Sequence, residues 1–323
     1  MSKKILVITP VKHIQGVSEI LEESGNVTYL EDPTYDDVKS CINNFHAIFT
    51  NPNKSKVYIS EELIQVGKKL EVICTASTGT NHIDTKYAEH SNLPVLSLTE
   101  ERDVINKISS TAEHAFALMM ISLRNIYPAY NSVLEGHWDY TNFIGRQINY
   151  LNIGVIGFGR LGSMFAKYCQ AFGANVMVYD PYKNAEKFGF NQFNDINVLL
   201  ERSDGISLHV HVTHETEKMI NAEALSKMSS DVIIVNTSRG EIVDEIALIN
   251  FLQSNPTAKY ATDVIDGEVK FKDKKESTLI NYANKNNNVL ITPHIAGMTK
   301  EAQQIAYQHA AKKLQGFFFN ENQ

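Results

Sequence analysis

Polar side chains follow three apolar runs in the second half of the chain, each run typical of a buried strand. These segments are NTSRGEIVDE (236–245) with Arg239, TDVIDGE (262–268) with Asp263 and Glu268, and TPHIAG (292–297) with His294. Because the carboxyl ends of parallel strands meet at one edge of a sheet, we expect Arg239, Glu268 and His294 to lie together there. Arginine offers a planar fork to a substrate carboxylate, and histidine exchanges a proton near neutral pH. A carboxylate on the second ring nitrogen would fix the tautomer of the histidine.

The stretch from Asn152 to Asp180 predicts the sheet that positions these residues. It reads as strand, turn, helix and second strand, and Gly157, Gly159 and Gly162 form G-x-G-x-x-G in the turn. Such a turn brings a pyrophosphate to a helix N-terminus, and an acid at the end of the second strand binds ribose hydroxyls and repels a 2′-phosphate. A glycine-rich turn can instead merely pack a helix on a sheet. The complete context, ending in Asp180, favours an NAD site.

Strand and helix patterns alternate through most of the chain, which predicts an α/β fold with parallel sheets covered on both faces. Two such blocks are visible, so we expect two doubly wound domains: residues 1–107 with 295–323, and residues 108–294. Ligands bind beyond the carboxyl ends of strands in such folds. The loops 50–57 and 77–82 follow strands of the first block and are therefore candidate binding loops.

Composition narrows the class of protein. The 323 residues are 43% hydrophobic and 21% charged, with a formal net charge of −7 and no basic block. A nucleic acid or an anionic membrane would require a clustered positive surface, so neither is an expected partner. Cys41, Cys74 and Cys169 lie far apart in apolar runs, which is typical of free thiols in a reducing compartment. With no signal peptide and no apolar run long enough to cross a membrane, we expect a cytoplasmic protein.

The segment 109–123 predicts a long buried helix, and an irregular segment, Tyr127–Tyr150, follows it. We expect Glu113 and His114 to satisfy groups at the start of the helix rather than to act in catalysis. The irregular segment carries Trp138 among other aromatic residues and is too uneven for a core element. An exposed aromatic arm of this kind is typical of an oligomer contact.

Seven segments in collinear order resemble the D-isomer-specific 2-hydroxyacid dehydrogenase family, and together they span nearly the whole chain. They are STGTNHID (77–84), TAEHAFALMM (111–120), GFGRLG (157–162), VYDP (178–181), NTSRGEIVDE (236–245), TDV (262–264) and TPHIAG (292–297). The resemblance implies a Rossmann NAD domain inserted in a flavodoxin-like substrate domain. It also implies a homodimer and a cleft that closes on a small 2-hydroxy or 2-oxo acid.

The resemblance also implies the roles of individual residues. Arg239 would hold the substrate carboxylate and carbonyl, His294 would be the acid/base, and Glu268 would be its partner. Asp263 would contact the nicotinamide amide. The expected substrate contacts are Lys54, Ser77, Thr78, Gly79, Arg239 and His294. The expected cofactor contacts are Gly157, Gly159, Arg160, Leu161, Gly162, Asp180, Pro181, His209, Val210, Thr216, Thr237, Asp263, His294 and Gly297.

The chain departs from the family pattern in two places. The stretch 269–288 lacks the proline that usually follows the glutamate, and we expect it to be a solvated surface loop. His211 stands where the family commonly has proline. Together with His209 and His214 it could suggest a metal site, but no cysteine or carboxylate completes a tetrahedral set. We therefore expect no metal, and we expect these histidines to line the cofactor cleft.

The substrate is the least determined feature. Lys54 and Lys56 lie where phosphoglycerate dehydrogenases carry basic residues, although two solvated lysines on a polar turn explain them equally well. We expect 3-phosphoglycerate first and glycerate next, or a glycerate, hydroxypyruvate or glyoxylate reductase. The chain ends at residue 323, so we expect no C-terminal regulatory domain and no serine feedback.

Two other functions fit the same fold. One is an NADH-sensing interaction protein, as in co-repressors related to this family. The other is formate or phosphite oxidation, and Glu268 speaks against formate because that branch has glutamine at this place.

Overall fold

The computed structural model describes residues 2–52, 57–268 and 274–320. Residue 320 is described by its backbone alone. The chain forms two compact units. Unit 1 is Met1–Ile108 with Gly297–Gln323, and unit 2 is Ser109–Ala296, which interrupts the sequence of unit 1. None of the helices in the described ranges combines the length and the apolar character that crossing a membrane requires.

Unit 1 is built on a five-stranded sheet in which all neighbouring strands are parallel. Its strands, in spatial order, are β2 (Asn26–Tyr29), β1 (Lys4–Val7), β3 (Ala47–Thr50), β4 (Val72–Thr75) and β5 (Val95–Leu96). Its helices are α1 (Val17–Ser24), α2 (Tyr35–Cys41), α3 (Glu61–Val66), α4 (Thr85–His90), α5 (Arg102–Ile105) and α13 (Lys300–Asn320). The order β2-β1-β3-β4-β5 is the flavodoxin-like one.

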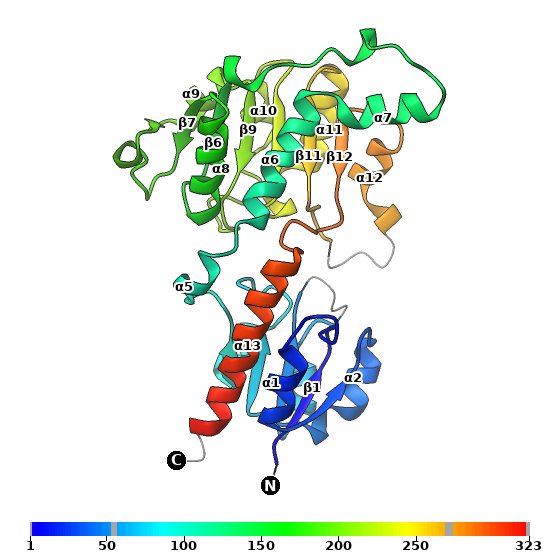
Figure 1. Ribbon diagram of the computed structural model, residues 1–323, viewed down its shortest axis with the longest axis vertical. Helices are drawn as coiled ribbons and strands as arrows, with labels where there is room; N and C mark the ends of the chain where they lie inside the picture. Colours follow the sequence, from blue (N-terminus) through cyan, green and yellow to red (C-terminus); the bar gives the residue numbers. More distant parts are fainter. Residues whose placement is uncertain (1, 53–56, 269–273, 321–323) are drawn as a thin grey trace. The chain divides into compact units, whose positions relative to one another are not determined.

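Alternation along β1 shows why helices cover both faces of this sheet. Ile5 and Val7 pack with residues of α1 and α13, which lie side by side in Figure 1, whereas Leu6 packs with α2, α3 and α4. Successive side chains of a strand point to opposite faces, so a strand that is apolar throughout needs a partner on each face.

Unit 2 is built on a seven-stranded sheet, also parallel throughout. Its strands, in spatial order, are β12 (Val289–Ile291), β11 (Lys259–Thr262), β10 (Ile233–Asn236), β9 (Gly205–Leu208), β6 (Asn152–Ile156), β7 (Asn175–Tyr179) and β8 (Asn191–Phe193). Its helices are α6 (Ser110–Leu123), α7 (Ile126–Leu134), α8 (Arg160–Ala171), α9 (Ile196–Arg202), α10 (Ala222–Ser226), α11 (Glu245–Ser254) and α12 (Thr278–Ala283).

The strand order of unit 2 reverses between β6 and β9, as in a Rossmann domain. Helices α6 and α8 cover one face of the sheet, and α9, α10, α11 and α12 cover the other, as Figure 1 shows. The expected α/β class with two doubly wound parallel sheets is confirmed. The reversal leaves a crevice at the carboxyl ends of β6 and β9, where ligands bind in such sheets.

Two segments are more ordered than the sequence suggested. The stretch 269–288 is not wholly a solvated loop, because its described part contains α12, where Leu279 is fully buried against the apolar core of unit 2. Ser277 accepts a hydrogen bond from the backbone N–H of Ile280 and thereby caps this helix. The irregular segment after α6 begins with the helix α7 and then runs through two short 3-10 turns, 141–143 and 148–150.

Candidate active site

The glycine turn joins β6 to α8, and close backbone packing explains two of its glycines. Gly157 adopts φ +92°, and a Cβ there would lie 2.5 Å from the carbonyl oxygen of His209. A Cβ on Gly162 would lie 1.9 Å from the carbonyl oxygen of Gly157, so neither position accepts a side chain. A Cβ at Gly159, by contrast, would meet no described atom within 4 Å. The turn is therefore packed against backbone at Gly157 and Gly162, whereas space is left beside Gly159 at the N-terminus of α8.

Asp180 directly follows β7 next to this turn, and backbone groups hold its carboxylate in place. Its Oδ2 accepts a hydrogen bond from the N–H of Phe158 at 2.6 Å. Its Oδ1 accepts from the N–H groups of Tyr182 and Lys183 at 2.8 and 2.9 Å. A half-buried carboxylate thus stands at the end of the second strand, and Pro181 beside it is exposed.

The loop after β9 forms the other wall of the crevice. His209 lies beneath the glycine turn, its ring packs on Phe165, and its Nε2 is 2.9 Å from Oγ of Ser207. Burial lowers the pKa of His209 to about 3, so the ring is neutral. Farther along, Thr216 accepts a hydrogen bond from the N–H of Thr213 at 2.8 Å. Among the described residues, no group of three His, Cys, Asp or Glu side chains could hold a metal.

Glu268 and His294 form a close pair. Oε1 of Glu268 lies 2.6 Å from Nδ1 of His294, and the two side chains are 21% and 29% exposed. Because a carboxylate accepts hydrogen bonds, we assign a proton to Nδ1 of His294. Nε2 is then left for a second partner. The absence of proline after Glu268 therefore does not displace this carboxylate from the histidine.

Asp263 holds the loop that carries His294. Its Oδ1 accepts from Oγ1 of Thr292 at 2.5 Å and from the N–H of Ile295 at 2.9 Å, and its Oδ2 accepts from the N–H of Ala296 at 2.7 Å. Its backbone carbonyl accepts from the N–H of His294 at 2.9 Å. These bonds support His294 at φ +55°, a left-handed conformation that costs energy for a residue other than glycine. Asp263 is 1% exposed and thus anchors this loop.

Arg239 follows β10, at the same edge of the sheet. Its Nη1 donates to the carbonyl oxygen of Ser238 at 2.6 Å, and its own carbonyl oxygen accepts from Nδ2 of Asn236 at 2.8 Å. The segment with Asp263 and Glu268 follows β11, the strand that pairs with β10. His294 follows β12, the next strand. The carboxyl ends of three adjacent strands therefore carry Arg239, Glu268 and His294.

The expected substrate loop lies in unit 1, after β4. Oγ of Ser77 donates to the carbonyl oxygen of Gly79 at 2.7 Å and lies 2.8 Å from Oγ1 of Thr75. Oγ1 of Thr75 in turn lies 3.1 Å from Nε2 of His82, which is buried, and burial lowers the pKa of His82 to about 4. This chain of hydrogen bonds fixes the loop, while Thr78 is exposed. Gly297 also falls in unit 1. Lys54 and Lys56 lie outside the described residues.

Comparison with known proteins places this geometry in a family. Residues 116–296 match the sequence model described as "D-isomer specific 2-hydroxyacid dehydrogenase, NAD binding domain". This chain belongs to the D-isomer-specific 2-hydroxyacid dehydrogenase family. The matched region covers the glycine turn, Asp180 and the three strand ends of the candidate site.

Similar proteins cover most of the chain. D-3-phosphoglycerate dehydrogenase of Methanocaldococcus jannaschii is 33% identical over 314 residues, 96% of this chain and 56% of that protein. Hydroxypyruvate reductase of Thermotoga maritima is 34% identical over 250 residues, 77% of this chain and 78% of that protein. The solved structure of D-lactate dehydrogenase from Aquifex aeolicus, complexed with NAD and lactic acid, has a TM-score of 0.82. It is 27% identical, covering 99% of this chain and 96% of that one.

The first three curated relatives are longer than this chain. All three are named D-3-phosphoglycerate dehydrogenase, and the matched region makes up 46 to 56% of their length. The chain thus spans about half the length of these relatives.

NAD is the cofactor of this dehydrogenase family domain, and the residues present fit it. The open space above Gly159 leaves room for a pyrophosphate at the N-terminus of α8, which has no side-chain cap. Oγ1 of Thr237 is buried without a hydrogen-bond partner among the described residues. A buried hydroxyl without a partner costs free energy, which a bound cofactor would recover.

Three expected cofactor residues, Arg160, Leu161 and Val210, also lie in this part of unit 2, the first two in the first turn of α8 and the third just after β9.

Glu113 and His114, both expected to satisfy groups at the start of their helix, have different contacts in the structure. Glu113 does satisfy a group at the start of α6, because Oγ of Ser109 donates to it at 2.5 Å. The side chain of His114 instead reaches the anchored loop, with Nε2 at 2.9 Å from Oγ1 of Thr292 and 3.6 Å from Oδ1 of Asp263. The available signal was a polar ring directly before the apolar run 115–121 of this helix.

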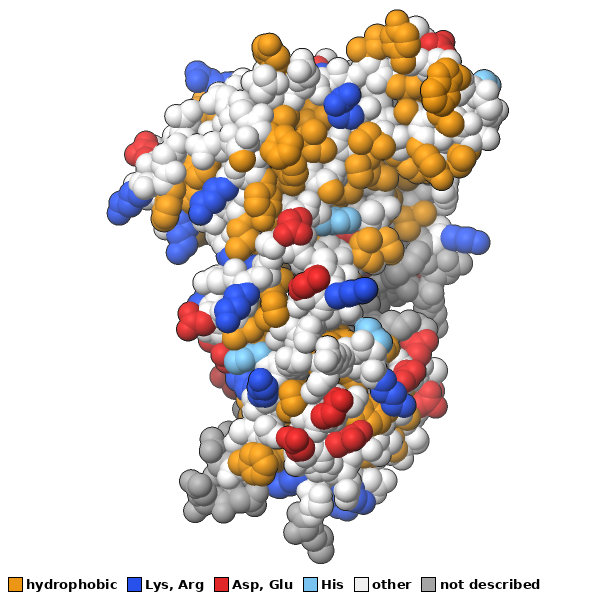
Figure 2. All heavy atoms as spheres, viewed as in Figure 1, with side chains coloured by type: hydrophobic (Ala, Val, Ile, Leu, Met, Phe, Trp, Pro, Cys, Tyr) orange, Lys and Arg blue, Asp and Glu red, His pale blue; other side chains and the backbone are white. Residues whose placement is uncertain are grey.

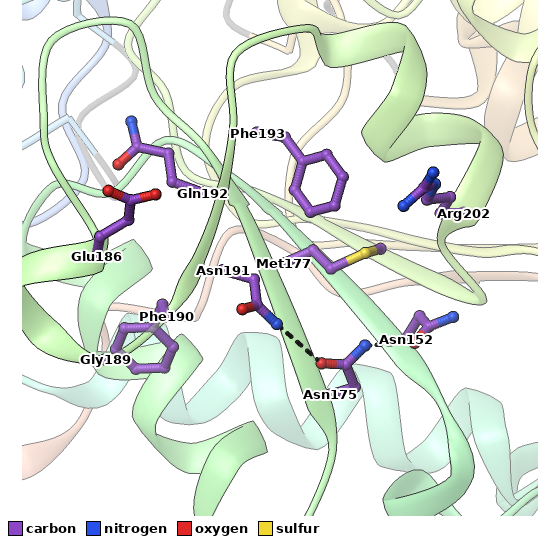
Figure 3. Close-up of a pocket in the computed structure, with 10 residues that line it drawn as sticks. All are labelled: Asn152, Asn175, Met177, Glu186, Gly189, Phe190, Asn191, Gln192, Phe193 and Arg202. Atoms are coloured by element: carbon purple, nitrogen blue, oxygen red, sulfur yellow. Dashed lines mark hydrogen bonds between the residues drawn. The ribbon is translucent and has the colours of Figure 1, made fainter.

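A separate cavity of about 780 Å³ lies at the amino ends of β6, β7 and β8. Figure 3 shows a ladder of amides there, in which Asn191 donates to Asn175, and Asn175 donates to Asn152. These residues start the strands, whereas Asp180, Arg239 and His294 follow strand ends. The cavity is therefore not part of the candidate active site.

Proposed function

We propose that this chain is an NAD-dependent oxidoreductase that transfers a hydride between nicotinamide and C2 of a small D-2-hydroxy or 2-oxo acid. The observation that supports it best is the 2.6 Å contact between Glu268 and His294. This pair follows strands of the sheet that also carries the glycine turn and Asp180. A proton-exchanging group and a cofactor cradle at one sheet edge suit combined hydride and proton transfer.

In the proposed reaction, His294 exchanges the proton and Arg239 holds the substrate. In oxidation, the hydroxyl proton of the substrate passes to Nε2 of His294, the C2 hydrogen leaves with its electron pair, and C2 becomes a carbonyl carbon. Glu268 stabilises the imidazolium that forms, since its carboxylate accepts from Nδ1. Arg239 holds the substrate carboxylate and the developing carbonyl with its guanidinium fork. A bound NAD would supply the hydride acceptor at nicotinamide C4, and bound NADH would supply the hydride donor in the reverse direction.

We assign the substrate contacts outside the NAD domain to the loop with Ser77, Thr78 and Gly79. Its backbone is fixed by the hydrogen bond from Ser77 to the carbonyl oxygen of Gly79. A fixed loop with available N–H groups suits a carboxylate, because ordering it costs no further entropy on binding. Asp263 takes the additional role of contact to the nicotinamide amide, and Gly297 is a further cofactor contact.

The leading substrate is 3-phosphoglycerate, with glycerate next. Names of the relatives support this choice, as do the positive charges of Lys54 and Lys56, which follow β3 in the sequence and suit a phosphate. The hydroxypyruvate reductase of Thermotoga maritima, most of whose length this chain matches, supports a glycerate or hydroxypyruvate reductase as the alternative.

Steady-state kinetics with NAD distinguish these substrates. We expect kcat/KM to be highest for 3-phosphoglycerate, then D-glycerate, then D-lactate. Lys54→Ala and Lys56→Ala should each lower kcat/KM for 3-phosphoglycerate by about tenfold and leave D-glycerate unchanged, because each lysine contributes one ionic contact to phosphate. Lys86→Ala, an exposed lysine of α4, is the control. Unchanged kcat/KM for 3-phosphoglycerate in both variants would contradict phosphate binding by these lysines. Absence of turnover with all three acids would contradict the proposed activity.

The active form is a homodimer in our proposal, joined by the arm 127–150. Figure 2 shows hydrophobic side chains gathered over the α7 region. Trp138 is 91% exposed, and Leu134, Tyr140, Ile144 and Tyr150 are also largely exposed. An apolar surface of this kind on one segment marks an interaction site.

The free thiols of all three cysteines favour a reducing compartment. We therefore propose that the protein is cytoplasmic, which cell fractionation tests.

Light scattering tests the dimer. We expect twice the mass of one chain for the unmodified protein, and the mass of one chain for the double variant Leu134→Asp with Trp138→Asp, because burying two carboxylates in an apolar interface is costly. Phe319→Asp, at an exposed aromatic residue of α13, is the control and should remain dimeric. A single-chain mass for the unmodified protein contradicts the proposal.

A further inference from the structure

The peptide group between Ile265 and Asp266 connects the segment after Arg239 with the segment that ends in Glu268. A Cβ on Gly240 would lie 2.0 Å from the carbonyl carbon of Ile265 and 2.1 Å from the nitrogen of Asp266, so this peptide lies directly on Gly240. The N–H of Asp266 donates to Oε1 of Glu245 at 2.9 Å. The segment 240–245 therefore contacts one peptide at two points.

The other side of the same peptide holds Glu268. The carbonyl oxygen of Ile265 accepts a hydrogen bond from the N–H of Glu268 at 3.3 Å, across a turn in which Gly267 adopts φ +69°. Since Oε1 of Glu268 meets Nδ1 of His294 at 2.6 Å, a continuous series of contacts runs from Glu245 through the peptide to the imidazole. Hydrogen bonds on both sides of a peptide polarise and strengthen each other.

Glu245 occupies a costly environment for a carboxyl group. The pKa of Glu245 is raised to about 7, chiefly by burial; the hydrogen bond from the backbone of Asp266 opposes the rise, and repulsion from Asp266 and Glu241 adds to it. Burial raises the pKa of Tyr260, and repulsion from Glu245 adds to that rise. An apolar side chain of the same size would avoid that cost at the first turn of α11. Helix capping does not require this carboxyl either, because Asp244 caps α11 through the N–H groups of Ile246 and Ala247.

We propose that Glu245 is a positioning residue for the proposed reaction: its carboxyl fixes the Ile265–Asp266 peptide on Gly240 and thereby places Glu268 against His294. The inference rests on the proposed function, because it gives Glu245 an effect on the acid/base pair. The same contacts join the segment after Arg239 to the turn before Glu268.

Two variants separate this role from stability. Glu245→Met keeps the volume but removes the acceptor, and we expect kcat to fall by about tenfold to a hundredfold, as displacing a reacting group by about 1 Å does. The pH at which turnover is half-maximal should fall, because a displaced Glu268 stabilises the protonated imidazole less. Glu245→Gln keeps an acceptor oxygen for the N–H of Asp266 and should restore kcat. The Kd for NADH, measured by fluorescence, should not change, since the glycine turn lies between β6 and α8.

Asp244→Ala is the matched control because it removes the cap of the same helix and leaves the peptide contact intact. It should lower Tm without moving the pH profile. Unchanged kcat and pH profile in Glu245→Met would overturn the inference, as would equal shifts of the pH profile in Glu245→Met and Asp244→Ala. Glu245→Ala serves the same comparison if methionine prevents folding.

A readout without turnover separates this inference from the proposed function. In an NMR spectrum of protein labelled at histidine, the Nδ1–H signal of His294, assigned by its loss in His294→Asn, should shift upfield in Glu245→Met, because the 2.6 Å hydrogen bond to Glu268 lengthens. If no acid is turned over but this shift occurs, the proposed reaction fails while the positioning role stands. If turnover is normal and the signal does not shift, the positioning role fails alone.

Discussion

Replacing His294 by alanine is expected to lower kcat by about a hundredfold to ten-thousandfold, which is the usual contribution of a positioned acid or base. The substrate hydroxyl then has to release its proton to water while the hydride leaves, so only the proton-transfer part of the barrier rises. Affinity for NADH should change little, because the cofactor cradle is formed by the β6–α8 turn and Asp180. Stopped-flow turnover and fluorescence titration with NADH measure the two quantities.

Glu268→Gln separates the roles of the two members of the pair. An amide keeps the shape and can still contact Nδ1 at the 2.6 Å position, but it carries no charge to stabilise the imidazolium. We expect a smaller loss of kcat than in His294→Ala, together with a shift of the pH profile of turnover. His13→Ala, at an exposed histidine of unit 1, is the control and should behave like the unmodified protein. A fully active His294→Ala protein would refute the mechanism.

Replacing Asp180 by alanine is expected to raise kcat/KM for NADPH relative to NADH by about tenfold to a hundredfold. A carboxylate about 4 Å from one unit of phosphate charge repels it by about 4 kcal/mol at an effective dielectric constant near 20, and screening by water and salt reduces that figure. NADH loses the acceptor for its ribose hydroxyls at the same time. The ratio of kcat/KM for the two cofactors measures the change.

Asp180→Asn distinguishes charge from geometry at this position. The amide oxygen can still accept from the N–H groups of Tyr182 and Lys183, whereas the amide nitrogen cannot accept from the N–H of Phe158, so the variant removes the negative charge and that one contact. We expect most of the change in cofactor preference to occur already in this variant. Glu186→Ala, which removes an exposed negative charge from the segment after β7, is the control. Equal use of NADPH and NADH by the unmodified protein would contradict the role of Asp180.

The sequence by itself determined the features that depend on local patterns. Apolar runs of four or five residues separated by amphipathic segments predicted both parallel sheets, because a strand buried on two faces must be apolar throughout. The glycine turn with Gly157 and Gly162 was also predictable, since only glycine tolerates the approach of backbone atoms at 2.5 and 1.9 Å. The contact between Glu268 and His294 also followed, because the order of parallel strands brings their ends to one edge.

Only the tertiary structure decided which groups satisfy one another at that edge. It showed that Asp263 anchors the loop of His294, that His114 reaches Thr292, and that Glu245 holds the peptide before Glu268. It also showed that the proline-free stretch after Glu268 contains a packed helix with Leu279 in the core. These contacts join residues about 20 to 180 positions apart. No local pattern encodes them, because a buried N–H or carboxylate finds its partner only after the chain has folded.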